Sequence, residues 1–365
     1  MISKTLILSI VLILILIVIA SYFVIKNKNG FNEITNDDLK KLLHSAPKTN
    51  LNLNFDLSNF YNPSDITIKA ENLIEKLYKD SVVHAEILFD PQILIEKGVP
   101  FLVIVDSLNR GLDKGRGKYK LSLKLIVSIS RDLRNKDIAF GIVEDIYKYN
   151  KYINENGLNP EWKIIGLDLN SNMKENTPES FRDVFKYASA CGLYKSAYCG
   201  EEEPSTFIWT SIQQLNCCRI NNGASAIDDA GLCSYLATPQ SVDGILQAYG
   251  GPHKIPLISC PTDYEDPKSI NIGDLMNLGI MCSINTGDNI SSKEGINDCW
   301  DLIIDNCVGN TKKHPITFAN LKELIINGFE SSWISDYQKE KYIEAVNQYF
   351  LINTPSLYQY IASKK

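Results

Sequence analysis

The stretch Ala197-Tyr198-Cys199-Gly200-Glu201-Glu202 contains a strand end that opens into an acidic, glycine-containing loop. A helix-like run, Ser180 to Leu193, precedes it, and the short segment Tyr194 to Tyr198 lies between the two. This order is typical of a parallel sheet whose strands alternate with helices. The stretch therefore predicts one strand and one loop of a larger repeated arrangement.

The same alternation extends from this stretch in both directions. Strands are predicted at Leu51–Phe55, Val82–Phe89, Leu121–Ile129, Lys163–Leu169, Tyr194–Tyr198, Cys218–Asn221, Ile255–Cys260 and Met281–Asn285. Helices are predicted at Asp37–His44, Ile66–Tyr78, Val99–Leu112, Ala139–Tyr149, Ser180–Leu193, Thr206–Leu215, Asp228–Ala237 and Ile272–Leu278, and from Thr317 onward, where Tyr337–Phe350 is the last long helix. About eight strands separated by helices favour an α/β fold, a (β/α)8 TIM-like barrel, with a doubly wound parallel sheet as the alternative.

Polar residues at the carboxyl ends of these strands are the candidates for chemistry, because active sites of such barrels lie at that face. They are Asn52, Asn54, Asp90, Asp168, Tyr198, Glu201, Asn222, Thr262, Asp263 and Asp288. Gly287 is considered with them because it also stands at a strand end. The formal net charge of -6 and the absence of a long basic run argue against a nucleic-acid partner. The nine cysteines form no Cys-x-x-Cys pair, which argues against a zinc finger. Several of them lie in or beside apolar stretches, which predicts mostly free core thiols, with a disulfide elsewhere as the alternative.

The amino-terminal residues form a separate region. Thr5 to Ile25 is almost wholly apolar and uncharged, and as a helix it would cross the hydrocarbon core of a bilayer, about 30 Å thick. We therefore predict a single-pass membrane anchor at residues 5–25, within a segment 1–30 that precedes a barrel at 31–365. The alternative is a cleaved signal peptide and a secreted protein. Lys4 on one side and Lys26 and Lys28 on the other leave the orientation open.

Motifs at the strand ends resemble those of the adenosine/adenine deaminase family, in the family's order. Pro47 to Asp56 resembles Pro-Lys-x-Glu-Leu-His-x-His-Leu-Glu, and Ala197 to Glu202 resembles Ala-His-Ala-Gly-Glu-Glu. Arg219 to Gly223 stands in place of Arg-Ile-Asp-His-Gly, and Cys260-Pro261 in place of the start of Cys-Pro-x-Ser-Asn. Ser283 to Asp288 resembles Thr-x-Asn-Ser-Asp-Asp. The resemblance extends from about Pro47 to about Val346 and implies a barrel of the metal-dependent hydrolase superfamily.

The resemblance also implies where zinc ligands would stand. Those four positions hold Asn52, Asn54, Tyr198 and Gly287. The position of the catalytic His holds Asn222, whereas Glu201 stands at the proton-transfer position and Asp288 at the position that holds the purine ring. Neutral amides and an absent side chain are poor zinc ligands, and none of the four His residues falls at a ligand position. We therefore predict no metal and no cofactor.

These replacements lead to a functional prediction. A zinc-bound water has a pKa near 7 against 15.7 for bulk water, whereas a general acid or base contributes only about 10²–10⁴-fold. The sequence thus favours a catalytically inactive purine-binding or scaffold module at a membrane. The alternatives are a deaminase-like hydrolase of a purine base or nucleoside with altered or metal-free chemistry, and a decaying gene copy that still folds. The predicted pocket residues are Asn52, Asn54, Asp56, Tyr198, Glu201, Asn222 and Asp288.

Overall fold

The computed structural model describes residues 35–60, 62–131, 136–170, 176–240, 253–287, 295–309 and 313–354. The chain divides into two compact units, residues 1–39 and residues 40–365. The predicted anchor at residues 5–25 and the predicted pocket residue Asp288 lie outside the described residues. Within the described ranges, no helix has the length and apolar character needed to cross a bilayer.

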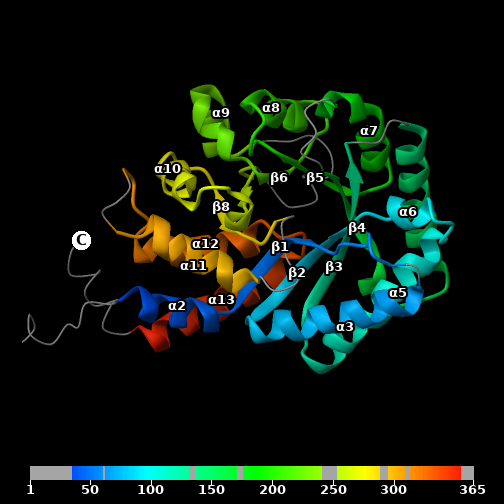
Figure 1. Ribbon diagram of the computed structural model, residues 1–365, viewed down its shortest axis with the longest axis horizontal. Coiled ribbons are helices and arrows are strands. Elements are labelled where there is room, and N and C mark those ends of the chain that lie inside the picture. The colour runs from blue at the N-terminus through cyan, green and yellow to red at the C-terminus, as the bar shows by residue number, and fades with distance from the viewer. Residues whose placement is uncertain are drawn as a thin grey trace, which may run out of the picture. The chain divides into compact units, whose positions relative to one another are not determined.

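The second unit is built on an eight-stranded parallel sheet whose strands neighbour each other in chain order, β1 to β8. The strands are β1 Lys48–Asn54, β2 Val82–Phe89, β3 Ser122–Ser130, β4 Ile164–Asn170, β5 Tyr194–Cys199, β6 Arg219–Asn222, β7 Leu257–Ser259 and β8 Cys282–Ile284. Figure 1 shows this sheet curved on itself with helices outside it. The strand order confirms the (β/α)8 barrel and excludes the doubly wound sheet, because a doubly wound sheet reverses its strand order.

The helices follow the strands as predicted, with two additions, at residues 92–95 and 296–307. They are α2 Asn36–Ser45, α3 Pro63–Lys79, α4 Gln92–Ile95, α5 Phe101–Lys118, α6 Lys136–Glu155, α7 Arg182–Ala190, α8 Ser205–Gln213, α9 Ala230–Ala237, α10 Ile272–Asn277, α11 Ile296–Cys307, α12 Phe318–Glu330 and α13 Asp336–Asn353. The sequence reasoning missed α11. Its signal was present, because Ile296, Cys299, Trp300 and Ile303 recur at helical spacing and are buried.

Amide side chains join β1 to the segment after β8, where the sheet closes. Asn285 Oδ1 accepts a hydrogen bond of 2.5 Å from the Leu51 amide. Asn50 Nδ2 donates to Thr286 Oγ1 at 3.0 Å, and the Gly287 amide donates to the Asn52 carbonyl at 3.4 Å. Buried backbone groups at this seam are therefore satisfied partly by side chains. Asn52 and Asn54, the polar residues that alternate with Leu51 and Leu53 in β1, are buried and half-buried respectively.

A buried ion pair forms the floor of the barrel at the amino ends of the strands. Arg219 Nη1 donates to Glu86 Oε2 at 2.5 Å, and the Trp333 amide donates to Glu86 Oε1 at 2.5 Å. The Trp333 ring lies 3.9 Å from the Arg219 guanidinium carbon. His84 completes the cluster, with Nε2 3.4 Å from Glu86 and Nδ1 2.9 Å from Ser122 Oγ. His84 is thus a structural residue far from the strand ends that carry chemistry, as its position in the sequence predicted.

The cysteines are free thiols, and most of them are buried. Burial raises the pKa of Cys199 to about 12, although the Ser211 hydroxyl opposes that shift. All nine positions lie within described ranges, so the prediction of free core cysteines is confirmed. A thiol that stays protonated behaves as a small apolar side chain.

Candidate active site

The hydroxyl of Tyr198, at the carboxyl end of β5, is the meeting point of three other polar side chains. It hydrogen-bonds to the Glu201 carboxyl group and lies 3.1 Å from Asp263 Oδ2. Asn222 Nδ2 donates to it at 3.4 Å. A phenol carries one proton, so it can donate to only one of the two carboxyl groups at a time. The arrangement therefore gathers two acids, a phenol and an amide at one edge of the barrel mouth.

Glu201 is the partly exposed acid of this group. It lies in the loop that follows β5, after Gly200, whose φ of 80° places the chain in the left-handed region. The pKa of Glu201 is raised to about 7: burial is the largest cause, the hydrogen bond from Tyr198 opposes the shift, and the negative charge of Asp263 adds to it. At neutral pH this side chain can therefore both give and take a proton.

Tyr198 itself stays protonated. Burial raises the pKa of its phenol well above the ordinary range, and Asp263 is the next largest cause. Only 2% of the side chain surface is exposed. A phenolate, the form of tyrosine that binds metal, is accordingly disfavoured at this position.

Asp263 is a site residue that the sequence reasoning did not select for the pocket. It ends a 3₁₀ turn, Pro261–Asp263, after β7, and it is buried. A methyl group placed on Gly287 would lie 2.0 Å from Asp263 Oδ2. The Asp263 carboxylate therefore fills the space that a side chain at position 287 would need. Asp263 could have been selected for the pocket from the sequence, because it follows Cys260-Pro261 at the end of a predicted strand.

Asn52 and Asn222 were predicted as pocket residues, and both are buried at the same end of the barrel. Asn222 Oδ1 accepts from the Ala224 amide at 3.2 Å, so its orientation is defined. Asn52 Nδ2 contacts Cys260 Sγ at 3.3 Å. Among the described residues, Asn52 Oδ1 has no hydrogen-bond partner. A buried acceptor of this kind is costly unless something donates to it, which makes Asn52 a candidate ligand contact.

Asn54 and Asp56 occupy a different part of the mouth. They line a cavity of about 170 Å³ with Asp90, Ser128 and Asn170, at the ends of β1 to β4. Asp56 is exposed and accepts from the Ser58 amide at 2.8 Å. Within the described ranges, no hydrogen bond joins Asp56 to the group around Tyr198. The predicted pocket residues thus fall into two clusters on one face.

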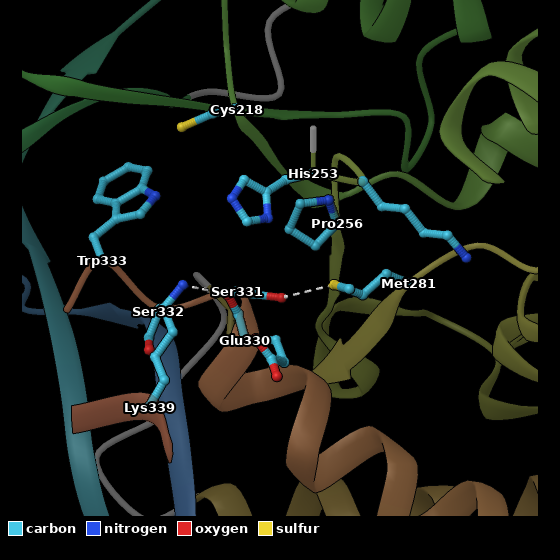
Figure 2. A pocket seen from close by; sticks show the side chains of 10 residues that line it. Cys218, His253, Pro256, Met281, Glu330, Ser331, Ser332, Trp333 and Lys339 are labelled. Atoms are coloured by element: carbon cyan, nitrogen blue, oxygen red, sulfur yellow. Dashed lines mark hydrogen bonds between the residues drawn. The ribbon is translucent and has the colours of Figure 1, made fainter. Parts of the chain in front are cut away.

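A second cavity, of about 70 Å³, lies at the opposite end of the barrel (Figure 2). Cys218, His253, Met281 and Trp333 surround it, from segments that precede β6, β7 and β8 or follow α12. Lys339 Nζ there donates to the Glu330 carbonyl at 2.8 Å. Because catalysis in (β/α)8 barrels takes place at the carboxyl ends of the strands, this cavity is not the candidate active site.

The residues at the mouth do not fit the zinc ion that the resemblance implies. Asn52 and Asn54 are neutral amides, Tyr198 keeps its proton, and Gly287 offers no side chain. Across the described part of the chain, no three or more His, Cys, Asp or Glu side chains are grouped so that they could hold a metal. Four-coordinate zinc sites need several imidazole, thiolate or carboxylate ligands together. No chemical step is therefore assigned to a metal, and metal content stays a prediction.

Comparison with known proteins identifies the family. The model of the adenosine deaminase family matches residues 57–349. An adenine deaminase from Crocosphaera subtropica is 31% identical over 77% of this chain and 78% of its own length. An adenine deaminase from Psychrobacter cryohalolentis is 27% identical over 87% of this chain and 89% of its own length.

Solved structures show the same fold. An amidohydrolase from Burkholderia ambifaria, solved with bound Zn, superposes with a TM-score of 0.72 at 18% identity, over 90% of this chain and 97% of that chain. An adenine deaminase from Arthrobacter aurescens gives a TM-score of 0.66 at 18% identity, over 90% of this chain and 93% of its own. At these identities the likeness concerns the fold alone.

These comparisons overturn the prediction of a catalytically inactive binding or scaffold protein. The relatives from Crocosphaera subtropica and Psychrobacter cryohalolentis are named as adenine deaminases and align over most of both chains, which favours the deaminase-like alternative. The prediction failed because it gave the lost metal-bound water more weight than the retained Glu201. It did not consider Asp263, the second acid that the fold brings to Tyr198. The chain belongs to the adenosine deaminase family.

Proposed function

We propose that this protein is a hydrolase that removes the amino group of a purine base, with adenine as the first candidate, through proton transfer by Glu201. One observation carries the proposal. Glu201 lies at the barrel mouth, bonded to Tyr198, with a pKa raised by burial to about 7. A carboxyl group that titrates near the working pH is suited to act as both general acid and general base. The adenine deaminases among its relatives supply the substrate class.

The proposed reaction balances with water as the only co-reactant. Protonated Glu201 gives its proton to the ring nitrogen beside the carbon that bears the amino group. A water oxygen bonds to that carbon and returns a proton to Glu201. Glu201 then protonates the amino group, the carbon–nitrogen bond breaks, and ammonia leaves. The hydroxyl proton passes back to Glu201 as the ring carbonyl forms, so the carboxyl group ends as it began.

The neutral amides of the mouth would hold the base. Asn52 Oδ1 is a buried acceptor that can take a hydrogen bond from the exocyclic amino group. Asn222 keeps the Tyr198 hydroxyl in place beside Glu201. We assign Asn54 and Asp56, which line the adjoining cavity of about 170 Å³, to the rim of the same pocket.

We expect the full-length protein to convert adenine to the deaminated purine slowly, because acid–base catalysis alone contributes about 10²–10⁴-fold. Chromatography would follow the loss of adenine, and an enzymatic assay would follow the release of one ammonia per purine. We expect the same rate with and without a metal chelator, since the mouth residues do not fit zinc. Absence of turnover by folded protein would refute the proposal. Loss of turnover on chelation would refute the metal-free chemistry.

Membrane attachment remains a prediction from the apolar run Thr5 to Ile25. We expect the full-length protein to sediment with membranes and to stay there after an alkaline carbonate wash, because an apolar helix of this length is held by hydrocarbon rather than by charge. Recovery of the full-length protein's product in the supernatant, with those residues cleaved from it, would indicate the secreted alternative. A variant lacking residues 5–25 is the matched control.

A further inference from the structure

The side chains at positions 263 and 287 compete for the same space. Gly287 has a φ of 90°, and any side chain on it would meet the Asp263 carboxylate, whose Oδ2, Cγ and Oδ1 lie 2.0, 2.4 and 2.5 Å from the place of a Cβ atom. The two residues come from the segments that follow β7 and β8. A carboxylate at 263 is therefore compatible with glycine at 287 and with little else.

The Asp263 carboxylate is also placed against the proton-transfer group. Its Oδ2 lies 3.1 Å from the Tyr198 hydroxyl, and the same hydroxyl bonds to Glu201. Only 4% of the Asp263 side chain is exposed. Two carboxyl groups thus share one phenol oxygen, in a partly buried space where two negative charges repel strongly.

We infer that Asp263 is a positioning residue of the active site: its buried carboxylate orients the Tyr198 hydroxyl and keeps the Glu201 carboxyl group in its protonated form. The inference rests on the proposed function, because it gives Asp263 its role through Glu201. Asp263 occupies the volume that a side chain at 287 would otherwise take. The described part of the site thus has a carboxylate at position 263, in the segment after β7, beside the glycine at position 287.

Among the described residues, the other charged groups that raise the pKa of Glu201 are on its own loop. Glu202 and Glu203 add negative charge beside it. Glu203 is paired with the buried Arg131, so its charge is largely compensated. Compared with Glu202 and Glu203, the charge of Asp263 has a larger effect on the pKa of Glu201. Removal of the Asp263 charge should therefore change the pKa of Glu201 more than removal of the charge of Glu202 or Glu203.

The test is Asp263→Asn, which keeps the shape and removes the charge. We expect activity to begin to fall at a pH about one unit or more lower than in the wild type. The reason is that removal of a like charge at this distance lowers a carboxyl pKa by about that amount. At pH 7 we expect kcat to drop while KM changes little. Glu265→Gln, an exposed acid in the same loop, is the matched control and should leave the profile unchanged.

A second measurement needs no turnover and so separates this inference from the proposed function. The folded-state pKa of Glu201 is raised above its unfolded value, so its contribution to stability is present at low pH and is lost as pH rises through about 7. We expect the melting temperature of the wild type to fall between about pH 4.5 and pH 8, from the ordinary pKa of a glutamate to just above that of Glu201, and that of Asp263→Asn to fall less. Equal pH dependence of both proteins, in rate and in melting temperature, would overturn the inference.

A double-mutant cycle tests the spatial coupling. Gly287→Ala should lower the melting temperature by more in the wild type than in an Asp263→Ser background, since serine leaves room for the added methyl group. The strain of a positive φ is common to both backgrounds and cancels in the comparison. Additive effects of the two substitutions would contradict the coupling between positions 263 and 287.

Discussion

Replacement of Glu201 by glutamine is expected to lower kcat/KM for purine deamination by about 10²–10⁴-fold, the contribution of a positioned general acid or base. At about 1.36 kcal/mol per tenfold change, this is a loss of roughly 3–5 kcal/mol of transition-state stabilisation. Glutamine keeps the size of the side chain and its hydrogen bond to Tyr198, but it cannot transfer a proton. The measurement is steady-state turnover of adenine at several pH values.

The neighbouring acid supplies the control for this prediction. Glu202 is exposed, and Glu202→Gln should change kcat/KM by less than about twofold, because screened surface charges have small effects. In the wild type, activity should decline as pH rises through about 7, since the protonated form of Glu201 begins the reaction and its pKa is raised to about that value. Equal activities of Glu201→Gln and the wild type would exclude Glu201 as the proton carrier.

The second large effect concerns stability. Glu86→Gln should destabilise the barrel by about 3–5 kcal/mol, because it leaves the buried Arg219 without its counter-ion. Glu86 also accepts a hydrogen bond from the Trp333 amide at 2.5 Å, so its replacement weakens two hydrogen bonds of this buried cluster. Burial by itself would raise the pKa of Glu86, but Arg219 and His84 outweigh burial and lower it. The charged form is therefore the one that the fold requires.

Urea denaturation monitored by tryptophan fluorescence would measure this change, and circular dichroism would test whether unfolding is two-state. Glu161→Gln is the matched control, because Glu161 pairs with Lys124 at 2.7 Å at the surface, with 41% of its side chain exposed. We expect that substitution to cost less than about 1 kcal/mol. A Glu86→Gln variant as stable as the control would show that the floor ion pair does not hold the barrel together.

The fold could be predicted because its signals are local. Several strands are runs of a few apolar residues, such as Val82 to Phe89, and begin or end at a turn signal that depends only on neighbouring residues. Glu201 was found for the same reason, since it stands in a loop directly after β5. The missed helix α11 also had a local signal, so that omission was an error of reading and not a limit of the sequence.

The candidate site was only partly predictable, because its chemistry depends on contacts between distant segments. Sequence alone predicted the barrel, identified by resemblance the replaced ligand positions, and singled out Glu201, which we propose as the proton carrier. Only the tertiary structure decided that Asp263 lies 3.1 Å from the Tyr198 hydroxyl and fills the space beside Gly287. It also decided the pKa of Glu201, which is set by burial and by Asp263. Burial and through-space charge arise when the chain closes into a barrel, and no run of neighbouring residues encodes them.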